Sequence, residues 1–276
     1  MAANEVVLID IDKVVASRAK GKKIPKFALR WLKSFIHQDW LNSYFKKGYL
    51  GTEFAEKALE HMGIKINIVG EENIPSEGRF TFACNHPLGG ADALAVTAFL
   101  GKKYDSKIVS PANDFLMNVK QLQEFLIPVN KMGSQGRGLS SLLDEAFNSD
   151  KQVYIFPAGV CSRKIDGVIQ DLPWKKTFIT KSRNSGRDII PLWFSGRNSN
   201  RFYNVDILCK KLKIKTNFAM FFLPDELYRA RNKEFTLVIG KPIPYTTFTS
   251  EKTDAEWAAW VREKTYELNN TGQWKR

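Results

Sequence analysis

Short apolar runs alternate with segments of helical periodicity through most of the chain, from residue 64 onward. We expect strands in the apolar runs, because each is brief and most end at Gly, Pro, Ser or Asn. The expected strands cover residues 64–70, 79–84, 106–110, 125–130, 152–159, 188–196, 217–223 and 235–243. One helix is expected to start near residue 91. Four others are expected over 114–125, 138–147, 173–183 and 253–268. This alternation predicts an α/β fold, with a mostly parallel sheet covered by helices on both faces.

The first 63 residues differ from the rest in charge and periodicity. Between residues 13 and 47 the chain has ten Lys or Arg and one acid, Asp39. The helical spacing places Phe27, Trp31 and Phe35 on one face, and Lys26, Arg30 and Lys33 fill the other. Helices are expected over residues 24–36, 39–47 and 52–62. We therefore predict a basic, amphipathic membrane-associating segment over 1–63 and an α/β domain over 64–276; the alternative is that the aromatic side chains pack on the core.

The formal net charge of +13 favours anionic partners such as nucleic acid, an anionic membrane or an acidic carrier protein. No helix-turn-helix, RNA-recognition or zinc signature accompanies the charge, so no nucleic-acid partner is expected. Three widely spaced cysteines indicate a reducing compartment. No signal peptide is recognisable, and no apolar run reaches the ~18 residues that a spanning helix needs. We expect a cytoplasmic protein, either soluble or lying on a membrane.

The stretch "RFTFACNHPLGGADALAV" carries the strongest chemical signal. His86 follows an expected buried strand, and Asp92 follows six residues later, within reach to orient the imidazole. No G-x-S-x-G motif supplies a nucleophile, so a substrate hydroxyl or amine is expected to attack an acyl or phosphoryl centre. Gly89 and Gly90 would let backbone N–H groups approach an oxyanion. The alternative is that Asp92 caps a helix and the glycines form a turn.

A second signal, "VYIFPAGVCSRK" at residues 153–164, also follows an expected strand. Its turn residues, serine and two cations suit an anion-binding loop, although a turn with solvated charges would have a similar sequence. Reactive residues gather beyond the carboxyl ends of parallel strands, so both stretches are expected at one edge of the sheet.

Four blocks in order resemble the glycerolipid acyltransferase superfamily: "NHPLGGAD", "FLIPVNKMGSQGRG", "FPAGVCS" and "DIIPLWFSGRNS". The resemblance implies acyl transfer from a thioester, on acyl carrier protein or coenzyme A, to a hydroxyl of a lyso-lipid. It implies His86 as general base, Asp92 as its orienting partner, and no bound metal or cofactor. The substrate-binding residues that it implies are Asn85, Gly89, Gly90, Lys131, Phe156, Pro157, Gly159, Ser162 and Arg163.

The blocks depart from the family pattern in ways that bear on the acceptor. The spacing is H-x5-D rather than H-x4-D, and Ala158 and Cys161 stand where the family has Glu and Arg. These features resemble the hemolysin-like branch, which includes the O-acyltransferases of ornithine and glycine lipids. The expected acceptor is a lyso-aminolipid at the inner face of the cytoplasmic membrane. The alternatives are a 1-acylglycerol-3-phosphate acyltransferase and a non-catalytic membrane-binding homologue.

Overall fold

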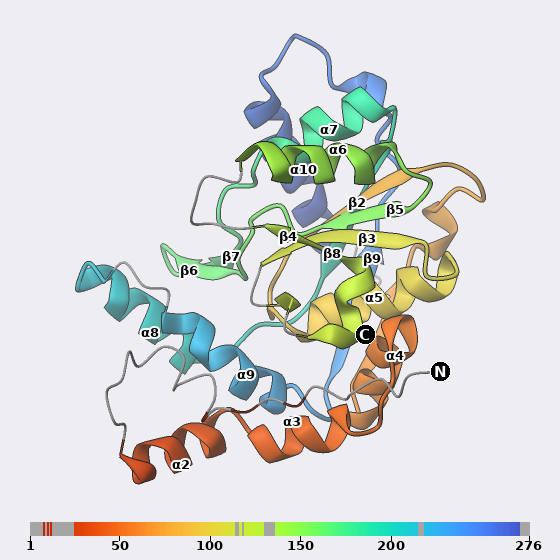
Figure 1. Ribbon diagram of the computed structural model, residues 1–276. Coiled ribbons are helices and arrows are strands. Elements are labelled where there is room, and N and C mark those ends of the chain that lie inside the picture. Colours follow the sequence, from red (N-terminus) through yellow and green to blue (C-terminus); the bar gives the residue numbers. More distant parts are fainter. Residues whose placement is uncertain are drawn as a thin grey trace.

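The computed structural model describes residues 25–113, 116–117, 119–129, 136–214 and 218–270, together with Leu8, Asp10 and Asp12. Within this part, seven strands form one sheet in the order β1-β9-β8-β2-β5-β3-β4, and β6 pairs with β7 in a separate hairpin (Figure 1). The strands are β1 (Lys65–Val69), β2 (Phe80–Cys84), β3 (Ile108–Asn113), β4 (Leu126–Val129), β5 (Gln152–Ile155), β6 (Arg163–Ile165), β7 (Val168–Gln170), β8 (Asp188–Phe194) and β9 (Glu234–Ile239). The α-helices are α2 (Lys26–Phe35), α3 (Gln38–Phe45), α4 (Gly51–His61), α5 (Ala91–Lys103), α6 (Gly136–Asn148), α7 (Thr177–Ser185), α8 (Asn200–Lys211), α9 (Leu223–Arg229) and α10 (Asp254–Glu267).

The strand directions decide which residues meet at one edge of the sheet. Neighbouring strands are parallel throughout, except that β8 and β9 are antiparallel. The carboxyl ends of β2, β5 and β8 therefore share an edge with the amino end of β9. This mostly parallel sheet confirms the predicted fold class, and it brings the segments after β2, β5 and β8 together.

Helices cover both faces of the sheet (Figure 1). Successive residues of β2 point to opposite faces, as the period of two requires. Phe82 and Cys84 pack in the larger core cluster, with residues of α4 and α5, whereas Ala83 packs in a second cluster with residues of α7 and α10. All five residues of β2 are buried, as expected for a central strand covered on both sides.

Two expected elements are wrong, and three were not expected. The apolar run at 217–223 is not a strand: Phe218–Phe222 is a 3-10 helix that leads into α9. It packs against α8 outside the sheet, and a short apolar run has no periodicity that separates these outcomes. The helix expected over 114–125 is, where described, the 3-10 helix Lys120–Phe125. The polar helix α8, the short helix α9 and the β6–β7 hairpin lacked a strong apolar pattern.

The helices before β1 differ in how they contact the core. α4 contributes buried Phe54 and Leu59 to the larger cluster, although it lies in the segment expected to be separate from the α/β domain. α2 has no buried residue. Phe27 and Trp31 are 77% and 64% exposed, while Phe35 packs edge-on against Phe222. The aromatic side chains of α2 thus lie mostly outside the core.

Candidate active site

Asn85 fixes the point at which the chain leaves β2 and enters the loop that carries His86. Its side-chain amide donates to the carbonyl oxygen of Phe194 at 2.9 Å and accepts from the N–H of the same residue at 2.6 Å. Phe194 is the last residue of β8, so these two bonds tie the loop to the neighbouring strand. Asn85 is buried, and both hydrogen bonds are therefore shielded from water.

His86 and Asp92 form a hydrogen-bonded pair, with 3.0 Å between Nδ1 and Oδ2. Asp92 lies in the first turn of α5 and is fully buried. The same Oδ2 also accepts the backbone N–H groups of Leu88 at 2.9 Å and Gly89 at 3.3 Å. The loop between His86 and Asp92 thus wraps around the carboxylate, so the longer H-x5-D spacing does not separate the pair.

The charges in this pair follow from its surroundings. Burial by itself would raise the pKa of Asp92, but His86 and the two backbone N–H groups outweigh it and lower that pKa. An ionised carboxylate only accepts hydrogen bonds, so Nδ1 of His86 carries the proton and Nε2 is the basic nitrogen. Burial would lower the pKa of His86, but the nearby carboxylates of Asp92 and Asp171 outweigh it and raise that pKa.

Phe156, at the end of β5, covers one side of the imidazole. The ring centroids of Phe156 and His86 are 4.1 Å apart and the ring planes are inclined by 28°. Asp92 thus fixes Nδ1 while Phe156 fixes the plane of the ring. The His86 side chain is 15% exposed, and Nε2 has no hydrogen-bond partner among the described residues. This arrangement leaves Nε2 able to accept a proton, as a general base would require.

Gly89 lets α9 pack closely on the His86 loop, and Gly90 lies at ordinary contact distance from the same helix. Gly89 has a φ of +80°, and a Cβ placed there would lie 3.0 Å from Leu223 and 3.2 Å from Cys161. A Cβ on Gly90 would lie 3.4 Å from Leu227. The N–H of Gly89 is engaged by Asp92, so it is not free to bind an oxyanion. Gly90, which precedes α5, keeps an N–H without a partner among the described residues.

The third block lies directly beside the His86 loop. The backbone N–H of Ser162 donates to the carbonyl oxygen of His86 at 2.7 Å. Earlier in the block, the backbone N–H of Gly159 donates to the carbonyl oxygen of Phe156 and closes a tight turn. The carbonyl oxygen of Pro157 accepts the backbone N–H of Lys175. The structure thus brings together the His86 loop and the Phe156–Ser162 turn, as their positions after two adjacent strands predict.

The side chain of Arg163 points into the protein, away from the contact between the His86 loop and the Phe156–Ser162 turn. Its guanidinium pairs with Asp206 at 3.0 Å, donates to the carbonyl oxygen of Cys161 at 2.6 Å and lies over the ring of Phe202. Only 2% of the residue is exposed. Cys161 is buried too, and burial raises its pKa to about 11. Lys131, the remaining predicted substrate-binding residue, lies outside the described residues.

The sequence analysis missed Asp171, a buried carboxylate that joins the two blocks. Its Oδ1 accepts the backbone N–H of His86 at 3.2 Å and the hydroxyl of Ser162 at 2.6 Å. Its Oδ2 accepts the indole N–H of Trp174 at 3.0 Å. Burial raises the pKa of Asp171 even though these groups donate to it. The only sequence signal was an acid in "IQDLPW", after the unexpected β6–β7 hairpin.

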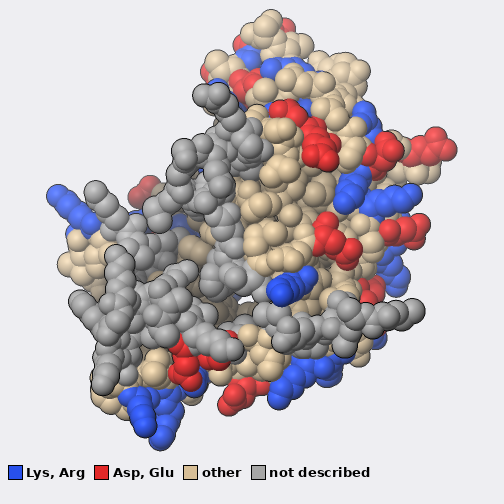
Figure 2. Space-filling view, in the orientation of Figure 1, with Lys and Arg blue, Asp and Glu red and all other residues tan. Residues whose placement is uncertain are grey.

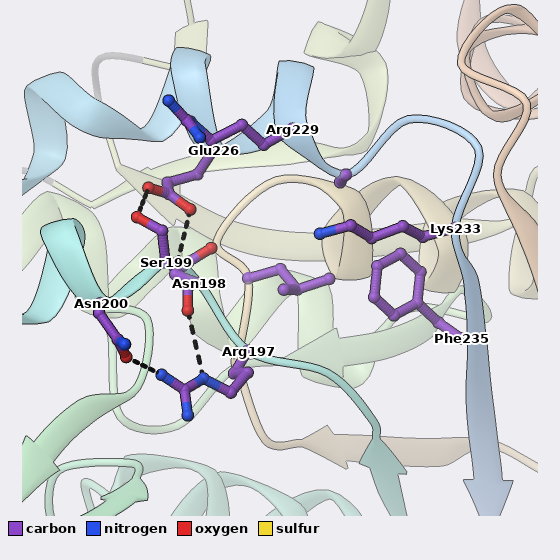
Figure 3. A pocket seen from close by; sticks show the side chains of 10 residues that line it. Arg197, Asn198, Ser199, Asn200, Glu226, Arg229, Lys233 and Phe235 are labelled. Atoms are coloured by element: carbon purple, nitrogen blue, oxygen red, sulfur yellow. Dashed lines mark hydrogen bonds between the residues drawn. The ribbon is translucent and has the colours of Figure 1, made fainter.

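A cavity of about 510 Å³ borders the same loop (Figure 3). Leu88, two residues after His86, lines one side of it, and Phe235 of β9 lines another. Arg197 and Asn198 reach it from the segment after β8, and Lys233 reaches it from the residue before β9. The antiparallel direction of β9 is what brings Lys233 to this edge. Among the described residues, no group of three or more His, Cys, Asp or Glu is placed to hold a metal ion.

Three comparisons with known proteins bear on the family and the fold. The sequence model of a family described as acyltransferase matches residues 13–273. A lyso-glycine lipid O-acyltransferase of Bacteroides thetaiotaomicron is 45% identical over 97% of this chain and 100% of its own length. Another of the same name, from Phocaeicola vulgatus, is 46% identical over 97% of this chain and 98% of its own. The crystal structure of the 1-acyl-sn-glycerophosphate acyltransferase of Thermotoga maritima has the same fold, with a TM-score of 0.52 and 16% identity over 94% of this chain and 88% of that one.

Proposed function

The chain is an enzyme of the acyltransferase family, and on that premise we propose that it moves a fatty acyl group from a thioester to a hydroxyl of a lyso-aminolipid. The observation that carries the proposal is a paired base without a neighbouring side-chain nucleophile. Nε2 of His86 is unpaired among the described residues, whereas Cys84 and Cys161 are buried thiols with raised pKa values. The hydroxyl of Ser162 is bound to Asp171. The acceptor hydroxyl itself is therefore the nucleophile.

In this mechanism the acceptor O–H donates to Nε2 of His86, and its oxygen attacks the carbonyl carbon of the thioester. His86 takes the proton as the C–O bond forms, and the ionised carboxylate of Asp92 stabilises the imidazolium. The tetrahedral intermediate then collapses and the C–S bond breaks. The leaving sulfur takes the proton from Nε2. The products are the acylated lipid and a free thiol, and His86 returns to its starting state.

We assign stabilisation of the tetrahedral oxyanion to the N–H of Gly90. It precedes the first turn of α5, where unpaired backbone N–H groups and the helix dipole favour negative charge. The neighbouring N–H groups of Leu88 and Gly89 are already occupied by Asp92. Gly90 is thus the donor of the loop that remains for substrate.

The proposed acceptor follows from the absence of the family's Glu and Arg in the third block. Ala158 and Cys161 offer no charge, and both are buried. Arg163, which stands close to the missing arginine, is committed to Asp206 and the core. In the described part of this block a phosphate group would find the exposed Lys164, and Lys175 lies beside the Gly159 turn, but neither stands at the positions of the missing Glu and Arg. The relatives named for lyso-glycine lipid favour a lyso-aminolipid with a free hydroxyl over lysophosphatidic acid.

The acyl donor in this proposal is a thioester of acyl carrier protein or coenzyme A, and no other cofactor is invoked. Both donors are anionic, and the chain carries a formal net charge of +13. Electrostatic attraction would raise the rate of encounter with either donor.

We further propose that the enzyme works at the inner face of the cytoplasmic membrane, with α2 in contact with lipid. The exposed rings of Phe27 and Trp31 share α2 with exposed Lys26 and Arg30. Figure 2 shows Lys and Arg side chains along the lower edge of the molecule, where Figure 1 places α2 and α3. Apolar and cationic side chains on one helix suit an anionic interface. Among the described residues, none of the helices is long and apolar enough to span a bilayer.

The proposed reaction is tested by giving the purified enzyme one acyl thioester and two acceptors in parallel, a lyso-glycine lipid and lysophosphatidic acid. We expect kcat/KM to be higher for the lyso-glycine lipid. A clear preference for lysophosphatidic acid would favour the phospholipid alternative. Failure to acylate either acceptor, with coenzyme A and carrier-protein donors alike, would favour a non-catalytic homologue.

A further inference from the structure

The cavity beside Leu88 has donors that the protein itself does not satisfy. Asn198 is 4% exposed, yet its side-chain N–H2 group has no hydrogen-bond partner. The ammonium group of Lys233 has no partner among the described residues, and Figure 3 shows it extending into the cavity. Lys233 is exposed, whereas the Asn198 amide is a buried donor. An unpaired buried donor is costly, and native structures usually satisfy it with water, an ion or a ligand.

The charges around the cavity leave an excess of positive charge for a ligand. Glu226, the acid that lines the cavity, accepts both the backbone N–H and the hydroxyl of Ser199. Arg229 pairs with Asp225 at 2.6 Å and turns away from the cavity in Figure 3. Arg197 bonds only to neutral oxygens, those of the Asn198 backbone and the Asn200 side chain. Arg197 and Lys233 therefore face the cavity without an acidic partner among the described residues.

The position of the cavity connects it to the catalytic loop. The backbone N–H of Leu88 donates to Asp92, the partner of His86, while Leu88 also lines the cavity. Leu88 and Phe235 supply an apolar wall next to the cations. A ligand with a charged end and a short apolar stem could thus place its far end near His86.

We propose that this cavity binds the carboxylate of the acceptor's amino-acid head group, with Lys233 and Arg197 as its ionic partners and Asn198 as a hydrogen-bond donor. This assignment rests on the proposed function, because it places the lyso-aminolipid hydroxyl at His86. A carboxylate supplies oxygen acceptors for the Asn198 N–H2 group and a negative charge for the two cations, while Glu226 stays bonded to Ser199. Head-group recognition thus lies after β8 and before β9, and not in the third block.

The test compares a lyso-glycine lipid with its methyl ester, which keeps the hydroxyl and chain but has no charge on the head group. The variants are Lys233→Met, which keeps most of the side-chain stem, and Arg197→Gln. Lys241→Met is the matched control, because Lys241 is an exposed lysine just beyond the opposite end of β9. All three variants lose one positive charge, so a general effect on membrane attraction is the same in each.

For the wild type we expect KM for the ester to exceed KM for the free acid by about 10-fold or more, the usual effect of losing a charge-assisted hydrogen bond. Lys233→Met and Arg197→Gln should each raise KM for the acid by a similar factor. They should leave KM for the ester and kcat near their wild-type values. Lys241→Met should match the wild type with both acceptors.

Equal KM values for acid and ester in the wild type would overturn the carboxylate site and leave the proposed function standing. The same conclusion follows if Lys233→Met and Arg197→Gln behave like Lys241→Met, or weaken acid and ester equally. If the wild type acylates neither lyso-glycine lipid nor its ester, the proposed function fails, and the carboxylate site fails with it. Thermal melting of each variant separates a loss of recognition from a loss of folded protein.

Discussion

The phenyl ring of Phe156 stacks on the imidazole of His86, 4.1 Å away between centroids. The two residues follow different strands, so the contact joins the first and third blocks at the imidazole ring. Phe156→Ala should let the imidazole tilt and lower kcat by up to about 100-fold, the effect of a small misplacement of a catalytic group. Phe156→Tyr keeps the ring and should retain most of the activity. A change confined to KM would contradict this role for Phe156.

Removing the base should stop the reaction and leave the protein folded. His86→Ala should lower kcat/KM by about 10²–10⁴-fold, the usual contribution of a general base. The N–H groups of Leu88 and Gly89 still donate to Asp92 in this variant, so the protein should fold, with a melting temperature lowered by the lost His86–Asp92 bond. Acyl transfer at the wild-type rate in this variant would remove His86 from the mechanism.

Asp92→Asn tests whether the carboxylate sets the tautomer. An amide oxygen in the place of Oδ2 would keep the bonds to Leu88, Gly89 and Nδ1, but without the charge that stabilises the imidazolium. An amide N–H2 group in that place would lose both backbone bonds and donate to Nδ1. Nε2 would then carry the proton and cease to be a base, for a loss of up to about 10⁴-fold in kcat. Loss of the charge also lowers the pKa of His86, so the acid limb of the remaining activity should move to lower pH. An unchanged kcat would show that orientation comes from Phe156 instead.

Asp171 should act on His86 through both position and charge. Its carboxylate helps to raise the pKa of His86, and activity is lost as pH falls through that pKa. Asp171→Asn should therefore move the acid limb of kcat/KM to lower pH. Ser162→Ala, the control, removes one hydrogen bond to Asp171 and keeps the charge, so its acid limb should stay in place. Identical pH profiles for Asp171→Asn and the wild type would reduce Asp171 to a structural residue.

Trp31 tests the membrane proposal. Its side chain is 64% exposed, so Trp31→Ala should cost far less than the roughly 3–5 kcal/mol of a buried aromatic truncation. It should weaken the apolar part of vesicle binding, which persists at high salt. Sedimentation with anionic vesicles at low and high salt measures this part. Val168→Ala is the control, since Val168 is 58% exposed on the β6–β7 hairpin, away from α2. Equal vesicle binding by the two variants would place the lipid contact elsewhere.

The sequence predicted the contacts that span few residues. His86 and Asp92 are six residues apart at a strand-to-helix turn, so their pairing followed from local geometry. The family resemblance was also confirmed, because the family model matches residues 13–273, a range that contains all four blocks. The predicted roles of the individual site residues remain predictions.

Contacts made through tertiary structure were beyond the sequence. Asp171 lies 85 residues after His86 and reaches it only after a hairpin that the pattern did not show. Arg163 was expected to face a ligand, but its partner Asp206 lies on α8, a helix with no clear amphipathic signal. Lys233 reaches the site edge because β9 runs against β8, a direction that hydrophobic periodicity does not specify.

The packing of α9 on the catalytic loop has an evolutionary consequence. Leu223 occupies space that a side chain on Gly89 would need, and Leu227 would be in direct contact with a side chain on Gly90. The residue before α9, Phe222, in turn meets Phe35 of α2. Side-chain contacts thus run from α2, through Phe222 and α9, to the His86 loop. Related enzymes that enlarge one of these positions must shrink a neighbour, so the sizes of these residues should covary even where the His–Asp pair never changes.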